Sequence, residues 1–478
     1  MKKILRYITT SCLMFAFFSS CKKDITSLNE NPKLPSNVDP GTLFANAQKK
    51  LTDILTTPSQ FENICRLFTQ YWAETVYTSE SRYANIMTNN IPGRFWNVLY
   101  ANVLKSLYEA KKLINAKNAG IDAIAKNKLA LIDILIVYTY SVLVDTYGNV
   151  PYSEALNVEN IHPKYDDAST IYNDLLVKLD AAINSLDISK TSFGVSDIIY
   201  KGDIDRWKKF ANSIKLRMGM RLVDVSGSNA KNIVEQAVQS GVFQSNADGA
   251  MFTYSTVPPN TNPIWENLIQ NERNDFVAAQ PFVDTMNALN DPRRMAYFTK
   301  VGNAYIGGKY GSQNNYVAFS HVGDRLIAEN MESFLMEYTE VEFLLAEAVE
   351  RGFAVGGTAE GHYKSAITAS MQYWNVPQPD IDAYLLQPAV AYSTATGDYK
   401  QKIGTQKWIA FYNRPFEAWC EWKRLDYPVL VKPANAASDI PKRLRYPVRE
   451  QNLNKEAYDQ AAGAIPGGDL FTSKVFWD

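Results

Sequence analysis

The sequence predicts a mostly α-helical protein in which a stack of helix hairpins carries long irregular segments. Several stretches place apolar residues three and four positions apart, which is the periodicity of one face of a helix. Other stretches are rich in Pro, Gly, Asn and aromatic residues and show no such periodicity. The composition fits a globular chain, because 46% of the 478 residues are hydrophobic and only 21% are charged.

The amino terminus has the layout of a secretory signal. The basic stretch MKKILRYITT precedes the apolar stretch SCLMFAFFSS, which is too short to cross a bilayer as a helix, since that takes about 20 residues. Ser19 and Ser20 lead directly into Cys21, as in a bacterial lipobox. We therefore predict that residues 1–20 are removed and that Cys21 is acylated, for example with palmitate. Ordinary cleavage nearby, with Cys21 left as a free thiol, is the alternative.

Residues 21–40 are expected to form a flexible tether. They are polar, they contain three prolines, and they offer little apolar surface to bury. The folded body is expected to occupy residues 41–478.

Two apolar helices are predicted in the first third of the body. Residues 96–114 carry Trp96, Leu99 and Val103 on one face. Residues 127–148 are more hydrophobic, but Asp133 interrupts them. We therefore predict a helix that is buried on nearly all sides rather than a membrane span. Gly148 is expected to end it with a left-handed cap, and the proline at position 151 prevents its continuation.

A third helix, residues 205–224, combines an apolar stripe with basic residues. Lys208, Lys209, Lys215 and Arg217 lie mostly off the stripe. A basic binding strip is one interpretation of this pattern, but charges usually occupy the outward side of a helix. We therefore expect these residues on a solvated face.

Residues 336–352 and 358–374 are predicted to form an antiparallel hairpin, because a short Gly-rich turn joins two helical patterns. Glu340 and Glu347 lie seven positions apart on the first of these helices, and a carboxylate pair could serve glycoside hydrolysis. Because other glutamates share this helix, we predict a solvated acidic face instead.

Other signs of chemistry are scarce. The net charge of −1 and the pI of about 6.4 do not suit a nucleic-acid binder. None of the three histidines lies in an HExxH motif, and the chain has neither a GxSxG elbow nor a phosphate-binding GxxxxGK[ST] loop. Asp291 in the sequence NDPRR could be a ligand of a structural calcium ion, but a helix-ending turn is favoured. Cys65 and Cys420 are predicted to be free buried thiols, although a fold that brought them together would let them pair.

The irregular segments carry the best candidates for a binding site. Residues 77–93, 251–276 and 301–325 interleave aromatic residues with amides and charges. Ring faces pack on sugars or on peptide side chains, while amides and Arg fix the orientation of a ligand. A buried loop anchor is the alternative role for each residue. The predicted ligand-binding residues are Trp72, Tyr77, Arg82, Tyr83, Asn262, Trp265, Tyr305, Tyr310, Asn314 and Tyr316, with Asn315 beside them.

Several motifs, taken together and in order, resemble those of one family. The motifs are LNENPK, DTYGNVPYSEAL, DIIYKGDIDRWKKFANSIKLRMGMRL, EVEFLLAEAVERG, QKWIAFYNRPFEAWCEWKRLDYPVL, IPKRLRYPVRE and a final FWD. With them the chain resembles the SusD/RagB-type nutrient-binding lipoproteins of the Bacteroidetes outer membrane. FWD departs from the double-Trp ending that is common in this family, and Lys423 stands where Arg is usual.

The resemblance implies a fold, a location and a function. The fold would be a scaffold of four tetratricopeptide-like helix pairs, with the irregular segments packed on it as the ligand face. The protein would sit on the outer membrane, facing the exterior, as a lid on a SusC-type TonB-dependent transporter. It would capture a glycan or a peptide without catalysis and without a cofactor. The shared motifs do not carry the family's ligand contacts, so the residues above come from composition and loop placement alone. A surface glycoside hydrolase and a scaffold or adhesin that binds only protein are the alternatives.

Overall fold

Helices dominate the protein, as predicted. The computed structural model describes residues 38–117 and 122–478 and is about 52% helical. Cys21, the predicted signal and most of the predicted tether therefore lie outside the described residues. Residues Pro40–Asp478 form one compact unit.

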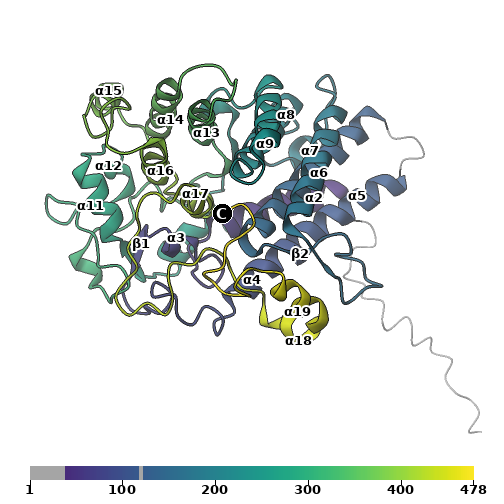
Figure 1. Cartoon of the computed structure of the whole chain (residues 1–478), viewed down its shortest axis with the longest axis horizontal. Helices are drawn as coiled ribbons and strands as arrows, with labels where there is room; N and C mark the ends of the chain where they lie inside the picture. The colour runs from purple at the N-terminus through teal and green to yellow at the C-terminus, as the bar shows by residue number, and fades with distance from the viewer. Residues whose placement is uncertain (1–37, 118–121) are drawn as a thin grey trace, which may run out of the picture. The chain divides into compact units, whose positions relative to one another are not determined.

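Consecutive helices pair as antiparallel hairpins, and the hairpins pack side by side (Figure 1). The hairpins are α6 (Ala123–Tyr147) with α7 (Ala168–Ser185), α8 (Ile204–Arg221) with α9 (Gly227–Gln239), α13 (Tyr338–Glu350) with α14 (Ala359–Tyr373), and α16 (Tyr399–Ala410) with α17 (Pro415–Leu425). This is the tetratricopeptide-like arrangement that the family resemblance implied.

A long helical rod packs against α2 (Pro40–Thr56) at one end of the stack. The rod consists of α4 (Ile91–Asn97), the π-helix η2 (Val98–Leu104) and α5 (Lys105–Lys117). Trp96, Leu99 and Val103 are buried along one side of it, as the spacing of residues 96–114 predicted.

The apolar helix α6 is a core helix. It is long and apolar enough to cross a membrane, but 89% of its most apolar window is buried inside the protein. Asp122 caps its start by accepting a hydrogen bond from the backbone N–H of Ala125. Gly148 ends it with a φ of +80°, a conformation that favours glycine.

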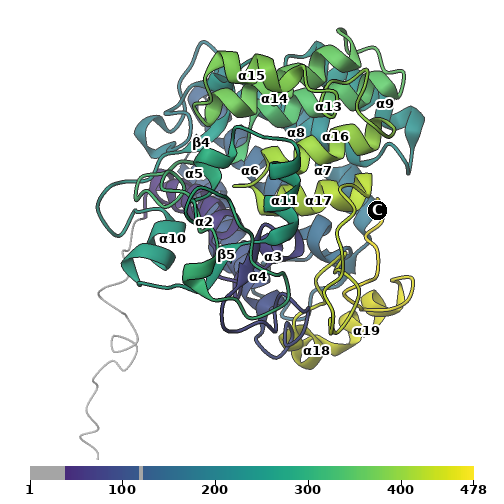
Figure 2. The same cartoon turned by 90° about the vertical axis from the view of Figure 1, so that its left-hand side faces the viewer.

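Short elements and loops cover one side of the hairpins (Figure 2). The strands form antiparallel pairs: β1 (Trp72–Glu74) with β5 (Phe276–Ala278), β2 (Val150–Pro151) with β3 (Tyr165–Asp166), and β4 (Ala250–Phe252) with β6 (Ser333–Met336). The short helices are α3 (Cys65–Phe68), η3 (Gly194–Ser196), η4 (Asn246–Asp248), α10 (Pro263–Trp265), η5 (Glu266–Gln270), α11 (Gln280–Ala288), α12 (Arg294–Tyr297), η6 (Tyr316–Ala318), α15 (Gln378–Leu385), α18 (Val448–Leu453) and α19 (Lys455–Gly463).

An aromatic cluster fixes these segments to the scaffold. Phe282 of α11 lies edge-on to Trp408 of α16, with ring centroids 4.7 Å apart, and Tyr297 of α12 stacks on Tyr412 at 4.5 Å. All four rings are buried. Such pairs add about 0.5–1.5 kcal/mol each beyond the burial of their area. The irregular segments are therefore built into the core and held firmly.

The prediction of solvated charged faces is wrong for part of α8 and α13. Lys215, Arg217, Glu340 and Glu347 are buried, whereas Lys208 and Lys209 stay partly exposed. Arg217 donates two hydrogen bonds to the carboxylate of Glu340, at 2.5 and 2.7 Å, and both side chains are almost completely buried. Glu347 is buried in the same way against Arg424. Lys215 is also buried and pairs with Asp180. Each of these helices is packed by neighbours on more than one side, so its charged face meets another helix instead of water.

The two body cysteines behave as predicted. Cys65 and Cys420 are free and buried. Burial raises the pKa of the Cys65 thiol to about 12, so this thiol stays protonated and unreactive at neutral pH.

Candidate functional site

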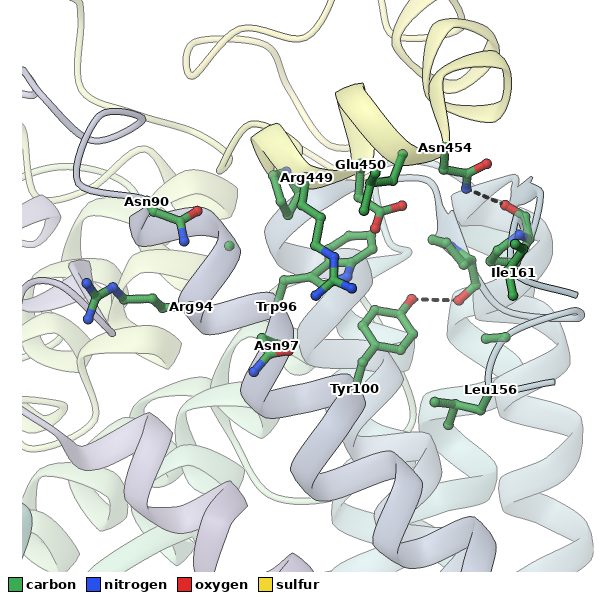
Figure 3. Close-up of a pocket in the computed structure, with 16 residues that line it drawn as sticks. Asn90, Arg94, Trp96, Asn97, Tyr100, Leu156, Ile161, Arg449, Glu450 and Asn454 are labelled. Atoms are coloured by element: carbon green, nitrogen blue, oxygen red, sulfur yellow. Dashed lines mark hydrogen bonds between the residues drawn. The ribbon is translucent and has the colours of Figure 1, made fainter. Parts of the chain in front are cut away.

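A cavity of about 540 Å³ opens between α4, α18 and the loop of residues 151–163 (Figure 3). This volume lies within the range of small-ligand sites, about 300–1,000 Å³. The segments that form it lie far apart in the sequence and meet only in the fold. Its lining residues are Asn90, Gly93, Arg94, Trp96, Asn97, Tyr100, Pro151, Ala155, Leu156, Ile161, Pro163, Pro447, Arg449, Glu450, Leu453 and Asn454.

Unusual backbone shapes both walls of this cavity. Asn90 precedes α4 in the left-handed conformation, with a φ of 52°. The π-helix η2 begins directly after Asn97, and π segments inside α-helices occur frequently at functional sites. On the opposite wall Leu156 has a φ of 60°, which is strained for a residue with a branched side chain. Strain that persists in a folded protein is a pointer to function.

Two rings form the floor of the cavity. Trp96 and Tyr100 lie one helical turn apart, with ring centroids 4.8 Å apart. The Tyr100 hydroxyl donates a hydrogen bond to the Pro151 carbonyl at 2.6 Å. Each of the two residues is only 9% exposed, so a small part of each ring reaches the cavity. The floor is therefore apolar and rigid.

The polar residues of the cavity fall into two groups. Glu450 accepts a hydrogen bond from the Tyr165 hydroxyl at 3.0 Å, and Asn454 donates one to the Pro163 carbonyl at 2.8 Å. These two contacts hold the walls together. Among the described residues, the side chains of Arg94, Asn97 and Arg449 have neither a hydrogen-bond nor an ion-pair partner, and all three are exposed. Figure 3 shows the Arg449 guanidinium reaching down from α18 toward the floor. These three residues can bind a ligand without first breaking a contact.

Five of the ten ligand-binding residues predicted from the sequence are buried, which corrects that part of the prediction. Trp72 is 0% exposed and donates a hydrogen bond to the Tyr412 hydroxyl at 2.9 Å. Asn262 caps α10, where it accepts a hydrogen bond from the backbone N–H of Ile264. At 6% exposure or less, and outside the cavity lining, these side chains do not meet a ligand at the surface. The buried five are Trp72, Tyr83, Asn262, Tyr310 and Asn314.

The other five predicted residues remain at least partly accessible, and they come from separate loops. Tyr77 is the most open, at 65% exposure. Tyr305 is half-buried, with the Arg294 guanidinium 5.6 Å from the centre of its ring. Tyr316 stacks on His321, with centroids 3.7 Å apart. The accessible five are Tyr77, Arg82, Trp265, Tyr305 and Tyr316. Among the described side chains, no ring pairing joins any two of these aromatic residues.

Neither the hydrolase nor the calcium alternative fits the geometry. Glu340 and Glu347 are both 0% exposed and are ion-paired with arginines, so no substrate reaches them. The carboxylate of Asp291 pairs with the Arg293 guanidinium at 2.5 Å inside the protein, and this cation occupies the place that a calcium ion would need. The described residues contain no group of His, Cys, Asp and Glu side chains suited to a metal.

The cavity was missed by sequence reasoning. Trp96 was placed correctly on a buried helix face, but Asn97 and Tyr100 were not singled out, and Arg449 stood only inside the motif IPKRLRYPVRE. The available signal was an aromatic pair with an amide on one turn of a helix whose first turn contains a Pro-Gly pair. That pattern alone does not indicate a binding site, because the opposite wall, α18, lies some 350 residues further along the chain.

Comparisons with known proteins agree on one family. A SusD-like family model, described as "Starch-binding associating with outer membrane", matches residues 32–447. A chitin-binding protein of known structure is 28% identical, with a TM-score of 0.80 over 92% of this chain and 100% of its own. A chitin-binding SusD homologue from Flavobacterium johnsoniae is 25% identical, with a TM-score of 0.77 over 91% and 97%. A SusD homologue from Bacteroides uniformis is 26% identical, with a TM-score of 0.79 over 92% and 99%. A search of curated protein sequences finds no match.

Proposed function

This chain belongs to the SusD-like family, and on that premise we propose that it is a lipid-anchored glycan-binding protein of the bacterial surface that delivers its ligand to a TonB-dependent transporter. The family is associated with the outer membrane, and its members are carbohydrate-binding proteins and not enzymes. Two of the similar structures are of proteins described as chitin-binding. These findings support a glycan as the ligand, with a peptide as the alternative.

The observation that carries the proposal is the cavity between α4 and α18. Its floor is aromatic and its rim holds an amide and two guanidinium groups without partners in the described structure. A sugar offers both an apolar face and a ring of hydroxyls, so it matches a site of this kind. Arg donates through a planar fork of N–H groups, which suits neighbouring hydroxyl oxygens.

The exposed loop residues are a second proposed contact surface. Tyr77 is open to solvent on the segment that follows β1, so its ring can stack on a sugar without rearrangement. Arg82, Trp265, Tyr305 and Tyr316 are proposed as further contacts. The cavity ranks above this surface because its residues converge on one space.

The anchoring and the transporter partner belong to the same proposal. Acylation at Cys21 would hold the body beside the membrane, because each buried methylene contributes about 0.8 kcal/mol. A delivery role needs a channel in that membrane. The proposal therefore predicts an acylated Cys21 by mass spectrometry and co-purification of the full-length protein with a large β-barrel protein.

Calorimetric titration of the soluble body, residues 41–478, against chitin and starch oligosaccharides and a peptide mixture tests the ligand class. We expect saturable binding of at least one saccharide without release of products. Arg449→Ala should weaken that binding by about tenfold, since a hydrogen bond to a charged group contributes about 1.5–3 kcal/mol. Tyr77→Ala tests the loop surface in the same titrations.

Lys455→Ala is the matched control. Lys455 is exposed on α19, pairs with Asp459 and does not line the cavity, so its loss removes one positive charge close to the site while the site itself stays intact. Affinity should stay within twofold. Binding of peptides alone would shift the ligand class, and failure to bind any small ligand would favour a scaffold or adhesin.

A further inference from the structure

A second cavity opens on the other side of α4. Its volume is about 450 Å³, and it is lined by residues of α2, the loop 57–62, α4, η2 and the segment 263–271. Arg94 lines this cavity as well as the first one. In Figure 3 the Arg94 side chain points away from Trp96, so its guanidinium lies off the floor of the first cavity. The two cavities therefore share one side chain.

The helical geometry explains this sharing. Residues three or four positions apart form a row along a helix, and consecutive residues point about 100° apart around its axis. One row faces the first cavity, and the adjacent row faces the second. The rows are Gly93, Asn97 and Tyr100 on one side and Arg94, Val98 and Asn102 on the other. Arg94 thus stands at the ridge between the two cavities.

The second cavity is suited to a neutral polar ligand. Its lining carries as many cations as carboxylates, and Lys49 pairs with Asp53 at 2.7 Å. The cations are Lys49, Lys50 and Arg94, and the carboxylates are Asp53, Glu62 and Glu266. The side-chain amides of Asn102 and Asn267 have no partner among the described residues. An amide both donates and accepts, as a hydroxyl does, so it can bind a sugar without a charge on the ligand.

We propose that the two cavities are the two halves of one site, crossed at Arg94, and that this site takes a linear oligosaccharide long enough to occupy both. The inference rests on the proposed function and specifies the ligand as a chain rather than a single sugar. The two linings together run from Asn90 before α4 to Asn102 in η2, about three helical turns, so a ligand that occupies both cavities is longer than a single sugar. Once one half is filled, the second half binds its part of the same chain at a high effective concentration.

Titration with ligands of increasing length tests this inference. The wild-type body is titrated with chitin and maltose oligosaccharides from the disaccharide to the octasaccharide. Affinity should rise at least about tenfold between the shortest and the longest member of the series that binds. It should stop rising once the chain spans both cavities.

Three variants test which cavity binds which part of the oligosaccharide. Arg449→Ala in the first cavity should weaken the disaccharide and the octasaccharide alike. Asn267→Ala in the second cavity should weaken only the octasaccharide. Arg94→Ala should remove most of the dependence on length, and Lys455→Ala should change none of these values. Thermal denaturation of each variant checks that the fold is retained.

The titrations distinguish failure of the joined site from failure of the proposed function. If saccharides bind but their affinity is independent of length, or if Asn267→Ala leaves the octasaccharide unaffected, the joined site is wrong and the proposed function stands. If no saccharide of any length binds the wild-type body, the proposed function fails and the joined site fails with it.

Discussion

Arginine has opposite roles in the stack of hairpins and at the cavity beside α4. In the stack, Arg217, Arg414 and Arg424 are almost fully buried, and each one is ion-paired. At the cavity, Arg94 and Arg449 are exposed and have no ion-pair partner among the described residues. A buried cation must be compensated by the protein itself, whereas an exposed one can be left for a ligand. The difference separates charge that fixes the fold from charge that is available for binding.

The buried charges link several hairpins at once. Glu340 of α13 accepts hydrogen bonds from Arg217 of α8 and, at 2.6 Å, from Arg414 at the start of α17. Burial alone would raise the pKa of Glu340, but these two guanidinium groups outweigh it and hold the pKa at about 2. Glu340 is therefore ionised at neutral pH and holds three helices in one arrangement.

The largest expected effect comes from breaking this network. Glu340→Gln should lower the free energy of unfolding by about 3–5 kcal/mol, because it removes the nearest carboxylate of two buried guanidinium groups. Arg217 and Arg414 then keep only longer contacts, 3.6 Å to Glu417 and 3.9 Å to Glu337. Urea denaturation followed by circular dichroism measures the change. If the free energy of unfolding falls by less than about 1 kcal/mol, the buried arginines do not fix the fold and their contrast with the cavity arginines is wrong.

The matched control is Glu360→Gln on the neighbouring helix α14. Glu360 pairs with Lys364 at 2.6 Å, but both side chains are more than 40% exposed. Exposed ion pairs contribute about 0–1 kcal/mol. The same chemical change should therefore alter stability by less than about 0.5 kcal/mol.

Glu74 provides an intermediate case, since it is a buried carboxylate that forms no ion pair within the described part of the chain. It is 1% exposed, and one of its oxygens accepts hydrogen bonds from the backbone N–H and the hydroxyl of Ser81. Burial raises the pKa of Glu74 to about 8. The folded state therefore binds this proton more tightly than the unfolded state does, and the stability that the protonated group contributes is lost as the pH rises from about 4.5 toward 8.

Glu74→Gln should remove this dependence, because an amide cannot ionise. The stability of the variant relative to wild type should increase by roughly 3.5 kcal/mol between pH 5 and pH 8, because wild type loses about 1.4 kcal/mol per pH unit between the unfolded and folded pKa values of Glu74. Urea denaturation at several pH values gives the two curves. Parallel curves would mean that Glu74 is not protonated in the folded state at neutral pH.

The sequence was sufficient to predict the hairpins, because their apolar spacing is local. Residues 96–114, 127–148 and 336–352 each form the helix that their pattern indicated. Gly148 and Gly352 both adopt the positive φ expected after a helix end. These features depend on neighbours within a few positions, so one chain is enough to show them.

The partners of charged side chains could not be predicted in the same way. A helical pattern identifies one apolar stripe and leaves the rest to solvent, but α8 and α13 are covered on several sides. Glu340 has two partners: Arg217 lies 123 residues away in the sequence, and Arg414 lies 74 residues away. No spacing rule covers such distances.

Several of the predicted ligand contacts are buried for a related reason. The prediction rests on aromatic residues in irregular segments, yet Trp72 and Tyr310 anchor their loops to the core through hydrogen bonds to Tyr412 and Leu67. Composition cannot distinguish an anchor from a contact, because both need a large ring with a polar atom. The cavity itself arises where α18 meets α4, which only the fold shows.

The smallest expected effect on stability comes from Arg449. Arg449→Gln should change the free energy of unfolding by less than about 0.5 kcal/mol, since the side chain is exposed and no partner is left unpaired when it is replaced. The same urea titration used for Glu340→Gln gives this value. If Arg449→Gln weakens ligand binding at unchanged stability, the loss belongs to the site and not to the fold. A loss above 1 kcal/mol would place Arg449 with the structural arginines and remove the distinction between the two regions.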